Sequence, residues 1–196
     1  MTSLDELRAQ AASCKDCDLW EHATQTVFGE GPAHAPLMLM GEVPGDKEDK
    51  AGHPFVGPAG KILDDALDEA GIDRSLVYVT NAVKHFKWVP ARGGKVRLHK
   101  KPNQAEITAC KQWWQRELDA LQPDVLGLLS ATAAQAVLGP KFRVTRERGT
   151  WIDLAHGVSA LATIHPSAVL RAQDRRDEEF AGLVADLRTI ANRLDS

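Results

Sequence analysis

Residues 41–60 constrain the fold of this chain more than any other stretch. The sequence GEVPGDKEDKAGHPFVGPAG is rich in glycine and proline, follows a short apolar run at residues 36–40, and leads into a helical pattern. This succession indicates a buried strand, a long loop and a helix. Loops of this length inside a compact domain are usually functional or disordered. Glycines let the backbone approach a ligand and prolines stiffen the chain, so the stretch predicts an ordered pocket wall.

Along the rest of the chain, the spacing of apolar residues is typical of helices in some segments and of strands in others, and the two kinds of segment alternate. The sequence predicts helices at about 4–12, 60–70, 104–121, 131–138 and 178–194, and strands at about 37–40, 77–80, 125–130, 151–154 and 159–164. At 196 residues the chain is long enough for one domain with a substantial core. Strands that alternate with helices indicate a single α/β domain over residues 1–196. We expect a three-layer sandwich with a mostly parallel central sheet, in which 151–154 is an edge strand.

Composition excludes several classes of protein. Hydrophobic residues make up 43% of the chain and charged residues 26%, which are ordinary values for a globular domain. No apolar run approaches the ~18 residues of a membrane span. The polar, acidic N-terminus, MTSLDELRAQ, does not have the pattern of a signal peptide. We therefore expect a cytoplasmic protein that does not enter a membrane.

Positive charge is concentrated in one segment. The net charge is −3, yet residues 84–101 contain no acid, so all 27 acidic residues lie elsewhere. A basic segment on an acidic body indicates contact with a polyanion such as nucleic acid. The segment has no clear period and has Gly93-Gly94 at its middle, so we expect an exposed loop; a solvated loop without a partner is the simpler alternative. Its basic residues are Lys84, Lys87, Arg92, Lys95, Arg97, Lys100 and Lys101.

Three polar side chains follow the ends of predicted parallel strands. Glu42 follows the first strand, Asn81 the second and His165 the last. Ligands of such sheets bind beyond the carboxyl ends of the strands, so we expect the three residues to converge on one rim. Taken alone, an asparagine in this position is more often a turn former, and a histidine is more often a capping or core residue.

The long loop also resembles a known motif. Its pattern of Gly-Glu-x-Pro-Gly, then Glu-Asp, then Gly-x-Pro-Phe-Val-Gly-x-Ala-Gly resembles the first motif of the iron–sulfur uracil-DNA glycosylases. His165-Pro166-Ser167 stands where that superfamily carries its other signature. The resemblance extends from about Cys14 to Arg171, which is most of the chain. It implies a uracil-DNA glycosylase-like fold and an enzyme that cleaves the N-glycosidic bond of uracil in DNA.

The resemblance also implies a pocket for a flipped base. An enzyme that acts on a base takes it out of the stack and binds it in a pocket. Asn81 would donate to uracil O4 and accept from N3–H, and Phe55 would stack on the base. Core packing is the alternative for the phenylalanine. The Asp46 region would contact the base, with Glu48 near uracil C5.

The second motif supplies the electrostatic part of the implied site. His165 would donate a hydrogen bond to uracil O2 and stabilise the negative charge that develops as the glycosidic bond breaks. Ser167 and Arg171 would bind phosphate or support the pocket. Val43 occupies the variable position of the first motif, where a polar residue is expected in one subgroup, family X. No side-chain role is therefore assigned to it.

Cysteine usage indicates a metal centre. Cys14, Cys17 and Cys110 are the only cysteines, and Cys-x-x-Cys in a cytosolic chain indicates metal or redox chemistry. The resemblance adds His85 and implies that these four residues bind a structural 4Fe-4S cluster. The residue types alone favour structural zinc with the same ligands. A buried Cys110 and an exposed His85 without any metal are the remaining alternative.

The segment Arg97-Leu98-His99 resembles an inserted loop of family X, whose histidine bonds to the sugar C1′ after uracil leaves. A neutral imidazole within reach would trap the oxocarbenium-like sugar before water does. The resemblance implies that His99 is this nucleophile, that Glu42 orients it, and that Arg97 holds the loop or a phosphate. Without the resemblance, His99 would be one more polar residue in a DNA-binding loop.

Together these patterns predict a monomeric uracil-DNA glycosylase that acts on uracil-containing DNA, with single strands as candidate substrates. Family X resemblance implies that the enzyme is trapped after a single turnover as a covalent adduct between His99 and C1′. A conventional hydrolytic iron–sulfur uracil-DNA glycosylase is the first alternative. The second is a non-catalytic, metal-stapled nucleic-acid-binding module, which would need only the basic loop.

Overall fold

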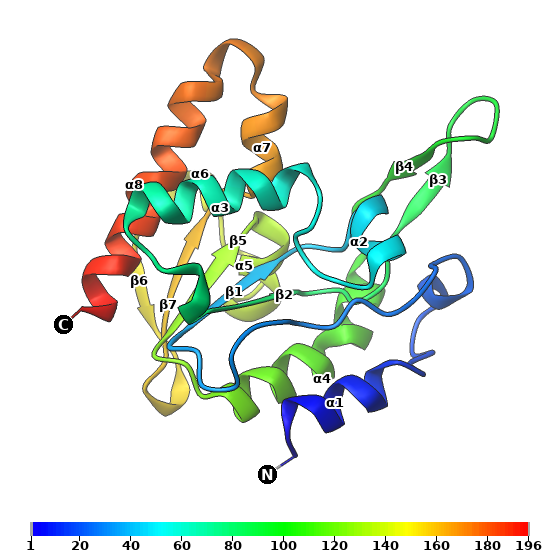
Figure 1. Cartoon of the computed structure of the whole chain (residues 1–196), viewed down its shortest axis with the longest axis horizontal. Coiled ribbons are helices and arrows are strands. Elements are labelled where there is room, and N and C mark those ends of the chain that lie inside the picture. Colours follow the sequence, from blue (N-terminus) through cyan, green and yellow to red (C-terminus); the bar gives the residue numbers. More distant parts are fainter. Residues whose placement is uncertain (1, 196) are drawn as a thin grey trace.

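A five-stranded sheet forms the centre of the protein (Figure 1). The computed structural model describes residues 2–195. The strand order is β2-β1-β5-β7-β6; the first four strands run parallel, and β6 pairs antiparallel with β7 at the edge. The mostly parallel sheet and the edge strand were both predicted from the sequence. The strands are β1 (Leu37–Gly41), β2 (Val77–Asn81), β5 (Val125–Leu129), β6 (Trp151–Asp153) and β7 (Ser159–Thr163).

Helices cover both faces of the sheet, which confirms the three-layer α/β fold. Alternate residues of β1 enter two separate cores: Met38 and Met40 pack on one face, and Leu37 and Leu39 pack on the other. Strands buried on both faces need continuous apolar sequence, which explains the run at residues 36–40. On the first face lie α1 (Leu4–Ala11), α4 (Gln104–Leu121) and α5 (Ala131–Leu138); on the second lie α3 (Pro58–Ala70), α7 (Pro166–Arg171) and α8 (Arg176–Leu194).

Several short elements were not predicted. The long loop of residues 41–60 contains a helix, α2 (Asp46–Ala51), and α7 begins inside the His-Pro-Ser motif, at Pro166. None of the helices within residues 2–195 is both long and apolar enough to cross a membrane. The remaining short pieces are α6 (Val144–Glu147) and the 3₁₀ turns η1 (Asp18–Glu21), η2 (Arg74–Leu76), η3 (Ala155–Gly157) and η4 (Gln173–Arg175).

The basic segment is a β-hairpin, which corrects the prediction of an exposed loop. Strands β3 (Trp88–Pro90) and β4 (Arg97–His99) pair antiparallel and project from the body (Figure 1). Gly93 and Gly94 both have positive φ angles, which glycine adopts without strain, and this closes the turn. The strands escaped prediction because each is only three residues long.

Lys84 does not belong to the exposed basic surface, which is a second correction. Its side chain is fully buried and forms an ion pair with Glu117 of α4, with Nζ 2.5 Å from Oε2. The same ammonium donates to the carbonyl oxygen of Asn81 at 2.9 Å. A buried charge is tolerated only when it is paired and hydrogen-bonded, and Lys84 meets both conditions. Lys84 therefore fixes the turn after β2 rather than contacting DNA.

Candidate active site

A cleft at the carboxyl edge of the sheet brings together three predicted residues. Glu42, His99 and His165 line the same cavity of about 500 Å³, although they come from β1, β4 and the end of β7. This position is where a parallel α/β sheet binds its ligands. A second cavity of about 470 Å³, beside the C-terminal end of α4, contains none of the predicted site residues. The wall of the first cleft also includes Lys100, Lys101, Ser130, Ser167 and Arg171.

Glu42 is held in a fixed orientation at the base of the cleft. The residue is 9% exposed, and its Oε2 accepts a hydrogen bond from the hydroxyl of Thr132. Thr132 lies in the first turn of α5, just after β5, and sequence reasoning missed it. The available signal was its position, because residues after β5 reach the same rim as those after β1. A carboxylate fixed in this way can orient a neighbouring base or stabilise positive charge.

His165 is a neutral histidine whose tautomer follows from its contacts. Its Nδ1 accepts a hydrogen bond from the backbone N–H of Ser167 at 3.1 Å and lies 2.7 Å from Ser167 Oγ. Arg171 donates to that Oγ at 2.8 Å, so the serine hydroxyl proton is free to point at the imidazole. The single ring proton is therefore assigned to Nε2. Burial, with a further contribution from the Arg171 charge, lowers the pKa of His165 to about 4.

Asn81 and Phe55 form a slot beside the cleft. Asn81 is 3% exposed and stands at the carboxyl end of β2. Gly41 lies between the two side chains: a Cβ there would stand 2.4 Å from Asn81 Oδ1 and 2.7 Å from the Phe55 ring. Phe55 also stacks on His165, with ring centroids 6.1 Å apart. An almost buried amide at the end of a strand can offer both a donor and an acceptor to the polar edge of a ligand.

The backbone at Phe55 is strained. Its φ of 56° is in the left-handed region, which aromatic residues rarely adopt. Gly60 makes this conformation possible, because a Cβ at that position would lie 1.7 Å from the carbonyl oxygen of Phe55. Backbone strain of this kind concentrates at functional sites, where the surrounding structure enforces it.

Two carboxylates predicted to lie near the base instead hold the loop. Oε1 of Glu48 accepts from the backbone N–H of Gly57 at 2.7 Å, which closes the stretch that carries Phe55. Asp46 pairs with Lys50 and with Arg97. Hydrogen bonds from Lys50 and Arg97 outweigh partial burial and lower the pKa of Asp46, so its carboxylate is charged. Both side chains are therefore engaged with protein groups.

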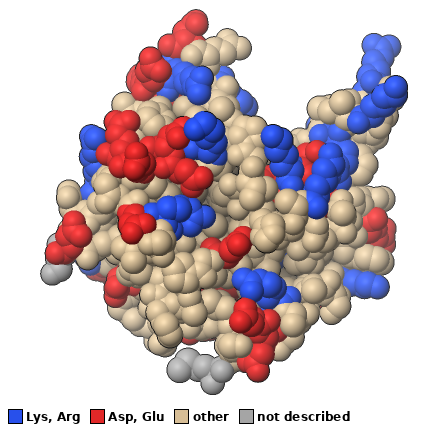
Figure 2. Space-filling view, in the orientation of Figure 1, with Lys and Arg blue, Asp and Glu red and all other residues tan. Residues whose placement is uncertain are grey.

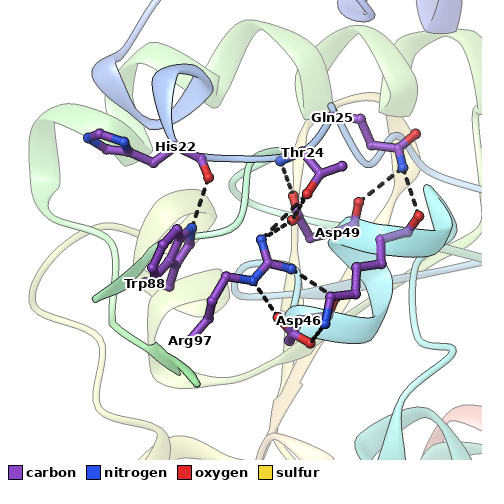
Figure 3. Close-up of polar contacts among 8 residues, drawn as sticks. His22, Thr24, Gln25, Asp46, Asp49, Trp88 and Arg97 are labelled. Atoms are coloured by element: carbon purple, nitrogen blue, oxygen red, sulfur yellow. Dashed lines mark hydrogen bonds and ion pairs between the residues drawn. The ribbon is translucent and has the colours of Figure 1, made fainter. Parts of the chain in front are cut away.

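Arg97 fastens the hairpin to the body of the protein (Figure 3). Its Nε donates to Asp46 Oδ1 at 2.5 Å, and its Nη1 donates to the fully buried Asp49 Oδ2 at 2.7 Å. Asp49 in turn accepts from the backbone N–H of Thr24, and Trp88 of β3 donates to the carbonyl oxygen of His22 at 2.9 Å. The planar guanidinium suits two carboxylates at once. We call this set of contacts the hairpin latch.

The hairpin latch places His99 in the cleft. His99 lies two residues after Arg97 on the same strand, so both side chains are on one face of the hairpin. The ring remains accessible to solvent but is partly desolvated, and this lowers its pKa from the ordinary 6.5. The negative charge of Glu42 opposes the shift, and Arg171 reinforces it. The imidazole is thus mainly neutral at pH 7, with a lone pair available as a nucleophile.

The predicted metal ligands lie on three separate parts of the chain. Among them, His85 has the hydrogen-bonding pattern of a metal-binding histidine. His85 is buried, and its Nε2 lies 2.9 Å from Thr26 Oγ1. That hydroxyl already donates to the carbonyl oxygen of Ala11, so it accepts from His85 and the ring proton is on Nε2. Nδ1 then carries a lone pair, is buried and has no partner. A ligating histidine has this arrangement, with its other ring nitrogen donating to an outer group.

The three cysteines have different surroundings, and Cys17 is the one close to His85. The neighbouring Cys110 and His85 lower the pKa of Cys17 to about 5, which favours the thiolate form that binds metals. Cys14 instead accepts from Trp113 Nε1 at 3.2 Å and lies 3.3 Å from Asp16. Within residues 2–195, no three Cys, His, Asp or Glu side chains converge closely enough to hold one ion. Thiolates and imidazoles are ligands of zinc and of iron–sulfur clusters alike.

Comparisons with known proteins identify the family of this chain. Residues 28–188 match the family model described as the uracil DNA glycosylase superfamily. The chain is 34% identical over 191 residues to a type-4 uracil-DNA glycosylase of Sulfurisphaera tokodaii, with 92% of this chain and 83% of the relative covered. It is 36% identical over 174 residues to the type-4 enzyme of Thermotoga maritima, with 88% and 84% covered. The Archaeoglobus fulgidus type-4 enzyme is 32% identical over 185 residues, with 91% and 88% covered. This chain therefore belongs to the uracil-DNA glycosylase superfamily.

Proposed function

We propose that this protein excises uracil from DNA. The observation that carries the proposal is the convergence of Glu42, His99 and His165 on one cleft, beside the nearly buried amide of Asn81. The names of the relatives, type-4 uracil-DNA glycosylases, support the same reaction. A module that only binds nucleic acid would require basic surface but not this set of polar groups.

Recognition rests on the slot between Asn81 and Phe55. The amide N–H₂ of Asn81 donates to uracil O4, and its Oδ1 accepts from N3–H. Cytosine has the opposite pattern at both positions, so it leaves two mismatched pairs and is rejected. Phe55 offers a flat apolar face to the base. Asp46 and Glu48 act on the base indirectly, because they hold the loop that carries Phe55.

Bond cleavage is assisted by His165. The C1′–N1 bond breaks with its electron pair passing to uracil, where negative charge accumulates at O2. Nε2–H of His165 donates to that oxygen, while Ser167 and Arg171 keep the proton on Nε2. Because the pKa of His165 is about 4, the ring stays neutral and acts as a hydrogen-bond donor without transferring its proton.

A second candidate function is covalent capture of the sugar by His99, in place of attack by water. The specific observation in its favour is that the hairpin latch holds His99 in the same cleft as Glu42. The imidazole lone pair would form a bond to C1′ as the positive charge develops on the sugar. Loss of the ring N–H proton to Glu42 or to solvent would then leave a neutral N-alkylimidazole. Such a group leaves poorly, so the adduct would persist.

One incubation separates these candidates. The protein is mixed with an oligonucleotide that contains one uracil, and the products are examined on a denaturing gel and by assay of free uracil. Uracil release with an upshifted protein–DNA band supports excision with capture. Uracil release with an abasic product and no upshifted band supports the hydrolytic reaction. If uracil is not released, the proposed function is wrong.

The hairpin latch leads to a testable prediction. Replacing Arg97 with alanine removes the partner of the buried Asp49 and frees the hairpin, so His99 no longer stays in the cleft. We expect the first-order rate of the chemical step at saturating DNA to fall by about 10–100-fold, because the reacting groups lose their alignment. DNA affinity is expected to change only severalfold. Hydrogen exchange in residues 88–99 is expected to become faster.

Arg97→Lys is the matched control for this prediction. An ammonium keeps the charge but cannot bridge two carboxylates in the way a guanidinium does. An intermediate rate for the lysine variant supports a positioning role for Arg97. Equal rates for wild type and both variants, with unchanged hydrogen exchange, would show that the latch does not position His99.

We further propose that Cys14, Cys17, His85 and Cys110 hold a 4Fe-4S cluster. The unpartnered Nδ1 of His85 and the proximity of Cys17 to Cys110 support this ligand set. Bound there, the cluster would supply a structural cross-link between the N-terminal segment, the turn after β2 and α4, because excision needs no electron transfer. Val43 packs in the same apolar cluster as Cys110 and also lines the cleft, so this region directly abuts the active site.

Loss of one ligand is expected to affect folding as well as metal content. Cys110→Ala should give a colourless protein with less than one cluster per chain and a much lower melting temperature, because metal binding is coupled to folding. The wild type is expected to be brown and to contain iron and sulfide. Ala109→Ser, which alters an adjacent position of the same helix, is the control and should keep its colour. A colourless wild type that is fully active and contains stoichiometric zinc would exclude the cluster.

A further inference from the structure

The hairpin has two faces of opposite character. Directly paired residues of an antiparallel ladder lie on the same face. The pairs Trp88–His99 and Pro90–Arg97 form the inner face, which carries the latch and points His99 into the cleft. The outer face is entirely apolar between its two ends. It consists of the pair Val89–Leu98 and the next pair along, Ala91–Val96, which is joined by a hydrogen bond from Ala91 N–H to the Val96 carbonyl.

This outer face, which we call the apolar strip, is exposed to solvent. Val89, Val96 and Leu98 are 38%, 58% and 47% exposed. Within residues 2–195 only seven large hydrophobic side chains are exposed, and these three all lie on one short hairpin. A surface strand normally turns its polar residues outward, whereas here Arg97 and His99 point inward. A contiguous exposed apolar surface of this kind indicates a binding partner.

The charges around the apolar strip identify the kind of partner. Lys100 stands at the base of the strip beside Lys87, whose own charge is paired with Glu106, and Arg92 and Lys95 lie at the tip. In the part of the chain that the structure describes, no carboxylate lies within ion-pair distance of Arg92, Lys95 or Lys100. The projecting arm is correspondingly blue at its tip in Figure 2. A partner must therefore offer negative charge and apolar surface together.

We infer that the apolar strip is a platform for unstacked bases of single-stranded DNA next to the flipped uracil. A single strand presents phosphates and apolar base faces at once, whereas a duplex hides its base faces in the stack. The strip adjoins the active site through Lys100, which lies on the same face of the ladder as Leu98 and also lines the cleft. The latch holds the hairpin in place, so this surface is preformed. The inference rests on the proposed function and adds to it a preference for single-stranded substrate.

The test uses two threonine substitutions on the apolar strip. Threonine has the β-branched shape that strands favour and carries a hydroxyl, so the hairpin should persist in Val89→Thr/Leu98→Thr. Leu76→Thr is the matched control, because Leu76 is also 47% exposed but lies before β2, at the opposite edge of the sheet. Binding is measured by fluorescence anisotropy on single-stranded and duplex oligonucleotides that carry 2′-fluoro-2′-deoxyuridine, which resists cleavage. Excision of ordinary uracil is measured in parallel.

We expect the double variant to lose about tenfold in affinity for single strands, and much less for duplex, with an unchanged salt dependence. The control should match the wild type on both substrates. Arg92→Ala/Lys95→Ala should instead flatten the salt dependence, by about 1.4 in log–log slope on single strands, because two phosphate contacts are lost. A 2-aminopurine placed next to the uracil should change its fluorescence on binding to wild type but not to the threonine variant.

Several outcomes would overturn the inference. Equal losses on single strands and duplex, or none on either, would show that the strip does not bind bases. A wild type that self-associates, together with a threonine variant that does not, would make the strip a protein interface. These results leave the proposed function intact as long as the wild type releases uracil. If the wild type releases no uracil, the proposed function is wrong, and the inference that rests on it is wrong as well.

Discussion

His99→Ala is expected to abolish the heat- and detergent-stable complex that we propose the wild type forms with uracil-containing DNA. The hairpin latch holds the His99 imidazole in the cleft with Glu42 and His165, and no other neutral nucleophile of the hairpin lies on its inner face. Removing the imidazole leaves space through which water can reach C1′. The variant should therefore still release uracil and become a hydrolytic enzyme that turns over. DNA affinity should be nearly unchanged, because the charges remain.

Three variants provide the controls for this experiment. His34→Ala alters an exposed histidine before β1, at the other edge of the sheet, and should capture DNA as the wild type does. His165→Ala should neither release uracil nor form the adduct, because the leaving group loses its donor. Glu42→Gln should slow capture while the hairpin stays in place. A cross-link that persists in His99→Ala would exclude His99 as the nucleophile, and a wild type without any adduct would favour simple hydrolysis.

The pH dependence of capture follows from the direction of the pKa shift. The nucleophile must be neutral, and desolvation lowers the pKa of His99 below 6.5. Capture should therefore be fully active at pH 7 and decline only as the pH falls below 6.5, where the imidazole becomes protonated. The pKa of His165, at about 4, lies lower still and does not limit the rate in this range. A decline that begins well above pH 7 would contradict this assignment.

Asn81→Asp is expected to reduce uracil excision by about a thousandfold. The substitution replaces the amide donor with a carboxylate that repels uracil O4 inside a nearly buried slot. Sites built to hydrogen-bond a substrate lose far more from a mismatched polar group than apolar pockets lose from a missing methyl group. Non-specific DNA binding should change little, since phosphate contacts supply it. The measurement is single-turnover uracil release, together with affinity for thymine-containing DNA.

Asn103→Asp is the matched control for the Asn81 prediction. Asn103 is the N-cap residue of α4, and its side chain accepts from the backbone N–H of Glu106 at 2.9 Å. Aspartate caps helices as well as asparagine does, so the same chemical change there should be neutral. Unchanged uracil excision by Asn81→Asp would exclude this residue as the one that recognises the base.

The sequence alone was sufficient for the layers of the fold. Continuous apolar runs alternate with amphipathic helices, and this pattern permits few arrangements other than a parallel sheet covered on both faces. It also located Glu42, Asn81 and His165 on one rim, because the carboxyl ends of parallel strands must meet there. Backbone geometry also explains the unusual glycine content of residues 41–60. Glycine is needed at positions 41 and 60, because a Cβ there would collide with the side chains of Asn81 and Phe55 or with the Phe55 carbonyl group.

Tertiary structure decided which polar side chains are free and which are engaged. Lys84 and Lys100 look equivalent in the sequence, but one is buried against Glu117 and the other lines the cleft. Arg97, Asp46 and Asp49 are distant in sequence, and only folding joins them as the latch. The hairpin could not be predicted from the sequence, because its strands are three residues long. Two strands this short pair stably only where other parts of the chain hold them in place. Local sequence fixes backbone preference, whereas the pairing of charges depends on distances that exist only after the chain has folded.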